Sequence, residues 1–238
     1  MALARSQQAV EGEPSSPETQ IGARLREERK RQDMSLSTLA DRLGITVSAL
    51  SQIETGRSRP SVTTLYGIVT ELGMSFDELF AQSPRPHGQE GAPERAAARH
   101  PRTAPGEEQI AQRFEDRPVI ELESGVKWER LNPIGERDVD FVEVEYDVGG
   151  ASSRGGKFVH HAGREYGVVT SGTLRVTVGF HQYDLRAGDS ICFDSAVPHR
   201  LETIGDEPAK AFWFVIGRAG SDARVQWPPE DGTTEAPE

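Results

Sequence analysis

The sequence predicts a two-domain α + β protein, in which a helical N-terminal domain precedes a strand-rich C-terminal domain. Between residues 20 and 81, apolar side chains recur at helical spacing between capping residues. Between residues 118 and 218, short alternating runs such as "TLRVTVG" and "AFWFVIG" are separated by glycine turns, which is typical of strands. Residues 82–117 are rich in Pro, Gly, Ala and charge and are predicted to be a flexible linker.

The two ends of the chain and its overall composition limit the class of protein and its location in the cell. Residues 1–19 and 219–238 are polar or acidic, contain proline and are expected to be disordered. The single cysteine, Cys192, excludes an intramolecular disulfide and a cysteine-cluster zinc site, which suits a reducing compartment. No apolar run approaches the length that spans a bilayer, and residues 1–20 lack the apolar core of a signal peptide. We therefore expect a cytoplasmic protein with no membrane partner.

The charge is unevenly distributed along the chain. The net charge of -11 argues against a nucleic-acid binder when it is taken over the whole sequence. Residues 20–81, however, contain eight Lys/Arg and eight Asp/Glu, so the rest of the chain carries the entire -11. The composition therefore leaves room for a DNA-binding domain at the N-terminal end.

The helical region divides into five short helices. Ile21 and Leu25 set the inner face of the first helix. Residues suited to N-capping open the second to fifth helices: Ser35, Thr46, Ser61 and Ser75. Glycines suited to a left-handed C-terminal turn follow the second, third and fourth: Gly44, Gly56 and Gly73. The second and third helices, joined at Gly44, predict a helix-turn-helix unit.

A helix-turn-helix unit places its second helix in the major groove of DNA. In the helix predicted over 47–54, Leu50 and Ile53 must face the core, which leaves the polar positions outward. A glutamine such as Gln52 can bind adenine bidentately, and positive charge in the following loop can hold phosphates. The predicted DNA-binding residues are Ser35, Thr46, Ser48, Ala49, Ser51, Gln52, Arg57 and Arg59.

The stretch "SLSTLADRLGITVSALSQIETGRSRPSVTTL" resembles a Cro/C1-type helix-turn-helix domain of the xenobiotic-response-element (XRE) family, without a gap. The resemblance implies a five-helix, lambda-repressor-like bundle in which the residues matching Thr46, Ser48, Ala49 and Gln52 lie at the DNA. The alternative is a small helical bundle that binds protein or only dimerises.

Two stretches of the strand-rich region, "KFVHHAGREYGVVTSG" and "GDSICFDSAVPHRLET", together resemble the paired motifs of the cupin superfamily. Residues 165–172 fit the end of the first motif and residues 188–199 fit the frame of the second. Asp194, Ala196 and Thr203 replace the proline, glycine and asparagine of the second motif. The resemblance implies a cupin β-barrel (jelly-roll).

Cupin metal sites typically use three histidines and a glutamate, and His161, Glu165 and His199 match three of these four ligands. Val159 stands where the other histidine would be, and strand alternation directs His160 to the opposite face from His161. Two histidines and a carboxylate can bind a divalent metal such as Fe, Mn, Ni or Zn with open positions. The same set can instead be a metal-free polar patch that binds a small-molecule effector.

Neighbouring residues are weaker candidates for the same pocket. Tyr166 is predicted to line it beside His161, Glu165 and His199. Aromatic residues on other strands could also line it or simply form core: Phe193, Phe212 and Phe214. Cys192 is expected to be a small core residue.

A helix-turn-helix followed by a cupin is a known regulator layout. We therefore expect a non-enzymatic transcriptional regulator that binds a double-stranded DNA operator as a homodimer and responds to a small-molecule effector or a metal ion. Because the linker is long, docking of the helices onto the cupin, or ligand-dependent dimerisation, fits better than a stiff lever. The alternative is a mononuclear iron enzyme of the hydroxypropylphosphonate epoxidase type, whose helical domain would not bind DNA.

Overall fold

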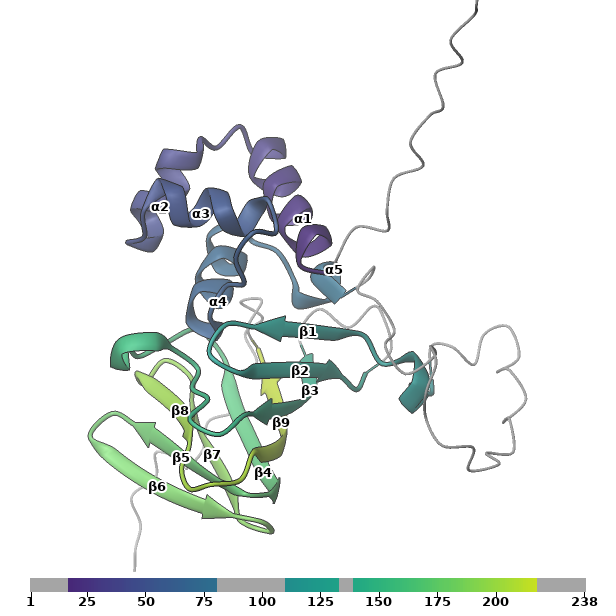
Figure 1. Ribbon diagram of the computed structural model, residues 1–238, viewed down its shortest axis with the longest axis vertical. Coiled ribbons are helices and arrows are strands. Elements are labelled where there is room, and N and C mark those ends of the chain that lie inside the picture. The colour runs from purple at the N-terminus through teal and green to yellow at the C-terminus, as the bar shows by residue number, and fades with distance from the viewer. Residues whose placement is uncertain (1–16, 81–109, 133–138, 218–238) are drawn as a thin grey trace, which may run out of the picture.

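The computed structural model of the protein describes residues 17–80, 110–132 and 139–217. It confirms the predicted two-domain α + β organisation: a bundle of helices lies against one end of two facing β-sheets (Figure 1). Residues 82–109 of the predicted linker, residues 1–16 of the predicted disordered N-terminus and the whole predicted disordered tail (219–238) lie outside the described residues. None of the described helices has the length and apolar character needed to cross a membrane.

Five α-helices form the N-terminal domain, and local capping explains their ends. Their bounds are α1 (Pro17–Arg31), α2 (Leu36–Leu43), α3 (Val47–Glu54), α4 (Val62–Glu71) and α5 (Phe76–Phe80). The predicted caps of α2, α3 and α4 accept a hydrogen bond from the backbone amide three residues on: Ser35, Thr46 and Ser61. Gly44 ends α2 in the left-handed region, at φ 61°. Ser75 and Glu78 cap α5 reciprocally.

The crossing of α1 and α3 is unusually close. A Cβ added at Gly22 in α1 would lie 2.2 Å from the carbonyl oxygen of Ile53 in α3. Only a glycine allows the two backbones to approach to this distance. The buried side chains of Leu25, Leu39 and Leu50 fill the space between α1, α2 and α3. The core of the bundle therefore fixes where α3 lies.

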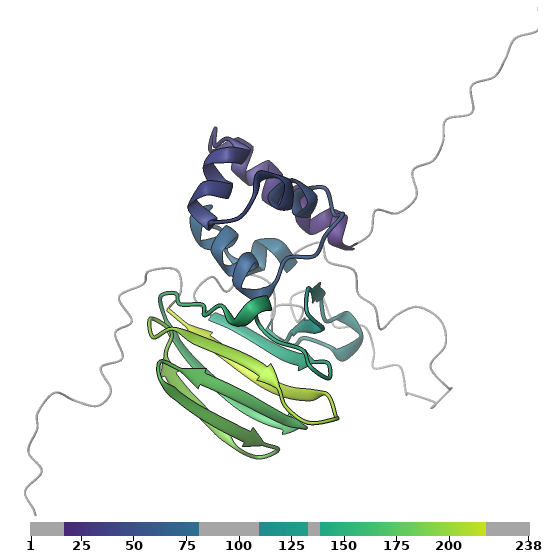
Figure 2. The same cartoon turned by 60° about the vertical axis from the view of Figure 1, so that its left-hand side comes forward.

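The C-terminal domain is a jelly-roll of two antiparallel sheets (Figure 2). One sheet has six strands in the order β1-β2-β3-β9-β4-β7, and the other has three in the order β6-β5-β8. The strands are β1 (Val119–Leu122), β2 (Val126–Arg130), β3 (Val139–Tyr146), β4 (Arg164–Ser171), β5 (Thr173–Val178), β6 (His181–Arg186), β7 (Ser190–Asp194), β8 (His199–Thr203) and β9 (Ala209–Ile216). Short 3-10 turns precede β1 (Phe114–Asp116) and β4 (Arg154–Gly156). The predicted cupin jelly-roll is confirmed, as a pair of facing sheets rather than one closed barrel.

Alternation along the strands builds the core between the sheets. Val142, Val144 and Tyr146 on β3 are buried, and Leu174 and Val176 on β5 are buried from the other sheet. The side chains between them on the same strands are more exposed, as a period of two requires. The core therefore lies between the sheets, and its end nearest the helices contains the candidate site.

The helical domain docks on the cupin domain through backbone and side-chain contacts. The amide of Glu123 donates to the carbonyl of Pro60 at 2.9 Å, and the amide of Thr63 donates to the carbonyl of Ser152 at 3.2 Å. α4 and α5 face the sheets, whereas α2 and α3 lie on the remote side of the bundle (Figure 1). Docking therefore leaves the helix-turn-helix unit turned away from the cupin domain.

Candidate functional site

The outer face of α3 has the polar character of a DNA-reading helix. Leu50 and Ile53 are buried in the bundle, whereas Ser48 and Gln52 are exposed and Ala49 and Ser51 are half-buried. Thr46 is exposed at the N-terminus of α3, where its hydroxyl caps the helix, and Ser35 does the same for α2. The predicted contact residues of α3 thus share one accessible face.

A buried ion pair holds α3 against α1. Arg29 donates from Nε to Glu54 Oε1 at 2.6 Å and from Nη2 to Glu54 Oε2 at 2.8 Å. Its Nη1 donates to the carbonyl of Met34 at 2.7 Å, in the turn before α2. The hydrogen bond to Glu54 raises the pKa of Arg29 above its ordinary value. Sequence reasoning missed this pair because its partners are 25 residues apart, although a glutamate on the inner face of α3 required a partner.

The two loop arginines have different surroundings. Arg57 is exposed, and its backbone amide donates to the carbonyl of Gln52 at 2.8 Å, close to the end of α3. Arg59 instead pairs with Glu121 of β1, with 2.7 Å between Nη2 and Oε2. In this arrangement Arg57 is free to meet a phosphate, whereas the guanidinium of Arg59 belongs to the interface between the domains.

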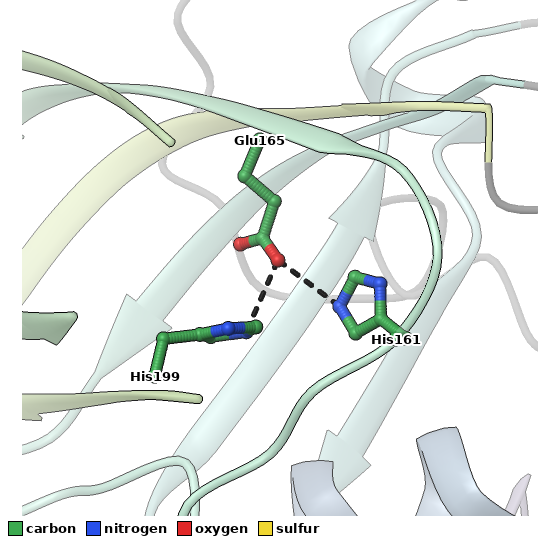
Figure 3. A group of neighbouring side chains, drawn as sticks. All are labelled: His161, Glu165 and His199. Carbon is green, nitrogen blue, oxygen red and sulfur yellow. Dashed lines mark ion pairs between the residues drawn. The ribbon is translucent and has the colours of Figure 1, made fainter. Parts of the chain in front are cut away.

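His161, Glu165 and His199 converge at one point between the two sheets (Figure 3). His161 lies just before β4, Glu165 lies in β4 of the large sheet, and His199 begins β8 of the small sheet. The Nε2 atoms of His161 and His199 lie 3.0 and 3.1 Å from the same Glu165 oxygen, Oε1. All three side chains are buried.

Backbone carbonyls set the orientation of both imidazoles. The Nδ1 atom of His161 lies 2.9 Å from the carbonyl of Ala162, and that of His199 lies 2.9 Å from the carbonyl of Val197. A carbonyl can only accept, so each Nδ1 carries a proton and donates. The Nε2 atoms are then the ones that either bind a metal or, when protonated, donate to Glu165.

Trp213 fixes the carboxylate from the opposite side. Its indole Nε1 donates to Glu165 Oε2 at 2.7 Å, which leaves Oε1 for the histidines. The indole ring rests on Gly167, because a Cβ there would lie 2.0 Å from the ring atom Cζ3. Gly167 and Trp213 are cross-strand partners on β4 and β9. The close approach of this pair therefore positions Glu165.

The contacts within the triad shift the pKa values of Glu165 and His199. Burial alone would raise the pKa of Glu165, but the hydrogen bonds from His161 and His199 outweigh it and hold that pKa well below its usual range. Burial alone would lower the pKa of His199, but its hydrogen bond to Glu165 outweighs this and raises it. Without a metal, the group is therefore a buried carboxylate facing protonated imidazole. A metal ion would take the place of the proton on His199 Nε2.

The triad borders a small cavity of about 40 Å³ that both domains line. The cupin domain contributes Trp128, Val142, Val144 and Leu201 beside the triad, and the helical domain contributes Val62, Tyr66, Phe76 and Phe80. The indole NH of Trp128 is buried and has no hydrogen-bond partner among the described residues. Sequence reasoning missed Tyr66, Trp128 and Trp213 because long-range packing brings them to the site.

Several predicted neighbours of the site face elsewhere. The prediction that Tyr166 lines the pocket is wrong: it follows the buried Glu165 on β4, so its side chain points outward and is 37% exposed. Phe212 and Phe214 also lie outside the cavity, where both pack near Phe141. Phe193 is buried and packs against His199, with ring centroids 5.0 Å apart.

Two further expectations concern residues beside the site. His160 is exposed, as strand alternation predicts. Cys192 is exposed rather than a core residue, because its neighbour Phe193 takes the inward position on β7.

The triad has the chemistry of a divalent metal site. Its ligand atoms, two imidazole nitrogens and one carboxylate oxygen, all lie within 4.8 Å of one another. Divalent first-row metals such as Fe, Mn, Ni and Zn accept such a mixed nitrogen and oxygen set, and three protein ligands leave positions open for water or a ligand. The donor set therefore fits a metal ion.

Comparison with known proteins identifies both domains. Residues 25–79 match the family model described as Helix-turn-helix, and residues 142–215 match the one described as Cupin domain. The chain is 29% identical over 180 residues to the HTH-type transcriptional regulator PuuR of Escherichia coli, which covers 75% of this chain and 84% of PuuR. The expected combination of an XRE-type helix-turn-helix with a cupin domain is confirmed.

Two solved structures are similar to most of this chain. A crystal structure of an HTH_3 family transcriptional regulator from Vibrio cholerae is similar with a TM-score of 0.55 and 23% identity, covering 84% of this chain and 96% of that one. Hydroxypropylphosphonic acid epoxidase from S. wedmorenis is similar with a TM-score of 0.39 and 22% identity, covering 84% and 97%. The likeness to the Vibrio cholerae regulator supports the fold.

Proposed function

We propose that this chain, which combines an XRE-type helix-turn-helix domain with a C-terminal cupin domain, is a DNA-binding transcriptional regulator of the cytoplasm. The observation that carries the proposal is the accessible polar face of α3, locked to α1 by the buried Arg29–Glu54 pair. The similarity to PuuR, an HTH-type transcriptional regulator, supports it. The affinity of this domain for an operator would be set by what occupies the cupin cavity.

The accessible face of α3 supplies groups for reading base edges. The Gln52 amide can donate to and accept from adenine in the major groove, and the hydroxyls of Ser48 and Ser51 can bond several bases. Arg57, exposed in the loop after α3, would hold a phosphate and fix the register of the helix on the duplex. Selection of bound sequences from random DNA tests this role: a defined motif is expected, and a lack of enrichment would contradict it.

The cupin cavity would take a metal ion or a small-molecule effector. If the ligand is a metal, His161, Glu165 and His199 would hold it, and Trp213 would keep the carboxylate in place. A bound metal would supply open coordination positions to a second, organic ligand. If the site is metal-free, Glu165 and the two imidazoles would bind a polar effector directly.

Metal content distinguishes these two cases. The protein is purified without chelators or a histidine tag, and its bound metal is measured by plasma mass spectrometry beside His161→Ala. Near-stoichiometric metal that is lost in the variant would assign the triad as ligands. No metal after incubation with iron, manganese, nickel and zinc would exclude a metal site and leave an organic effector.

A homodimer would present two α3 helices to two half-sites, one helical turn of DNA apart. The outer face of the large sheet carries aromatic rings in neighbouring strands, with Phe141, Phe214 and Tyr166 aligned across β3, β9 and β4. Exposed apolar patches of this kind are typical of protein interfaces. Sedimentation velocity tests this: Phe212→Lys, on the same face, is expected to shift a dimer towards monomer, whereas an unchanged dimer would exclude this face.

The composition of the triad favours one second candidate, a mononuclear iron enzyme, because two histidines and one carboxylate are the ligand set of non-haem iron oxygenases. The cavity of about 40 Å³ leaves no room for a substrate while the helices are docked. Absence of iron binding in the metal measurement would remove this candidate.

A further inference from the structure

We infer that the ligand site is a chamber shared by the two domains, with the helical domain as its lid and the ring of Tyr66 as its gate. A small organic ligand would enter by displacing Tyr66 from His161 and would thereby release the helices from the sheets. The role of the cavity as a ligand site rests on the proposed function. The gate can be tested without DNA, metal or effector.

The contact between Tyr66 and His161 closes the chamber. Their rings lie 4.5 Å apart with 8° between their planes, so the tyrosine covers one face of a triad imidazole. Edge-on contacts surround the same ring, with Phe76 at 4.8 Å and Trp128 at 5.7 Å. Tyr66 belongs to α4, whereas His161 and Trp128 belong to the cupin domain. One face of the His161 ring is thus covered by the helical domain and not by the cupin domain.

The space left beneath Tyr66 is too small for an organic effector. Its volume of about 40 Å³ holds a metal ion with its water, or a few water molecules. Pockets for small organic molecules are typically about 300–1,000 Å³. A ligand of ordinary size therefore requires a wall to move.

The wall that can move without unfolding either domain is the interface between them. A groove of about 600 Å³ runs from solvent along α4, between Thr63 and Thr70 on one side and Lys157 and Phe158 on the other. Tyr66 and Val159 line both this groove and the cavity. The groove thus leads from solvent to Tyr66, and Tyr66 separates the groove from the triad.

The chemistry of the chamber indicates the class of ligand. Once Tyr66 has moved, the face of His161 that it covered would stack against a planar group of the ligand. The indole NH of Trp128, buried without a partner among the described residues, would donate to an acceptor on the ligand. The surrounding walls are apolar side chains such as Val142 and Leu201. A small planar organic molecule with a hydrogen-bond acceptor meets these requirements.

Release of the lid must break contacts around the aromatic cluster as well as within it. These include the Arg59–Glu121 ion pair, the Thr63–Ser152 hydrogen bonds, the Glu123–Pro60 hydrogen bond and the guanidinium of Arg130, which lies 5.9 Å from the centroid of the Phe80 ring. The ion pair is about half exposed on each side, so its net contribution is small. A ligand that binds only the open chamber would shift the equilibrium towards the released state.

Chemical labelling of histidine tests the gate. Diethyl pyrocarbonate acylates accessible imidazoles, and mass spectrometry locates the label. His160 and His181 are exposed and serve as references within the same molecule. In the wild-type protein we expect His161 to react at least about tenfold more slowly than His160, since it reacts only through the open state. Equal rates would overturn the inference.

Variants then show whether Tyr66 and the interface control that rate. Tyr66→Ala is expected to raise labelling of His161 about tenfold or more, and Tyr66→Phe, which keeps the ring, to leave it within about twofold. Arg59→Ala weakens docking without removing a core residue, so it should raise labelling of His161 by up to about fivefold. The matched control is Arg175→Ala, which breaks the Arg175–Asp184 pair on β5 and β6, remote from the lid.

The pattern across the variants decides the result. If Tyr66→Ala is folded by circular dichroism and labels like the wild type, Tyr66 is not the gate. If Tyr66→Ala does not fold, the decision falls to Arg59→Ala: faster labelling of His161 than in Arg175→Ala supports a lid, and identical labelling overturns it. Failure to bind metal or DNA would concern the proposed function alone, because these rates are measured on metal-free protein in the absence of DNA.

Discussion

The ring of Tyr66 in α4 lies parallel to the ring of His161 beside β4, with 4.5 Å between the ring centroids. One residue belongs to the domain that carries α3 and the other to the triad of the cupin domain. Any ligand that requires Tyr66 to move changes how the two domains are joined. By linkage, anything that favours the docked state must in turn oppose that ligand.

The role of α3 is tested first at Gln52. Gln52→Ala should weaken binding to the selected operator by about 1–3 kcal/mol, because a bidentate contact with a base is lost. Binding to non-specific DNA should change little. The measurement is the Kd for both duplexes at one salt concentration, and equal losses on the two duplexes would remove Gln52 as a base-reading residue.

Arg57 should behave differently from Gln52. Arg57→Ala should lower affinity for operator and non-specific DNA alike and reduce the slope of log K against log salt by about 1, since one phosphate contact is lost. Titrations at several salt concentrations give this slope. An unchanged slope would show that Arg57 does not contact a phosphate.

The Arg29–Glu54 pair should dominate the stability of the helical domain. Arg29→Ala leaves the buried Glu54 carboxylate without its partner, which typically costs about 3–5 kcal/mol of unfolding free energy. Denaturant unfolding measures it. The control is Arg31→Ala, which removes an exposed partner of Glu28 and should change stability little. Equal effects of the two substitutions would contradict the structural role given to Arg29.

Trp213 should act on the triad through Glu165. Trp213→Phe keeps an aromatic ring over Gly167 but removes the hydrogen bond to Glu165 Oε2. Loss of such a supporting bond typically lowers metal affinity by about 10–100-fold. Competitive titration of Zn²⁺ against an indicator measures the effect. Wild-type affinity in a folded variant would show that the carboxylate needs no support from Trp213.

The metal-free triad should make stability depend on pH. The lowered pKa of Glu165 means that its contribution is present above its ordinary value of 4.5 and is lost as the pH falls through the folded-state pKa. The raised pKa of His199 means that its contribution is present below its ordinary value of 6.5 and is lost as the pH rises through the folded-state pKa. The pair therefore stabilises the fold most between these two values.

Thermal unfolding of chelator-treated protein checks this dependence. The Tm should fall as the pH rises above 6.5, and Glu165→Gln should flatten the fall. Added Zn²⁺ should raise the Tm most at the higher pH, because the metal requires unprotonated Nε2 atoms. A Tm of the metal-free protein that keeps rising with pH would contradict the assigned charges.

Local features of the fold were predictable from the sequence. A capping hydroxyl acts within three residues, so Ser35, Thr46 and Ser61 could be assigned before any tertiary structure was known. His161, Glu165 and His199 could be grouped because two cupin-like motifs carry them. The outward position of Tyr166 follows from the same strand alternation that turns Glu165 inward. The alternation therefore already contradicted the prediction that Tyr166 lines the pocket.

Residues that depend on docking were not predictable. Tyr66 reads as an ordinary core position of α4, and nothing near it in the chain shows that its ring covers an imidazole 95 residues later. Arg59 is predicted to bind phosphate because positive charge in the loop after α3 can hold phosphates, and its ion pair with Glu121 could not be anticipated. Such contacts arise from long-range packing, which local secondary-structure propensity and hydrophobic periodicity do not predict.

Labelling of His161 in the presence of operator tests most directly whether the cavity and the DNA-binding surface are coupled through Tyr66. Docking would fix the spacing of the two α3 helices in the proposed dimer, so the operator should bind the docked state more tightly and thereby favour the closed lid. We predict that operator duplex slows the reaction of His161 with diethyl pyrocarbonate relative to a scrambled duplex, while His160 and His181 are unaffected. A His161 rate that is identical with operator, with scrambled DNA and without DNA would contradict the coupling.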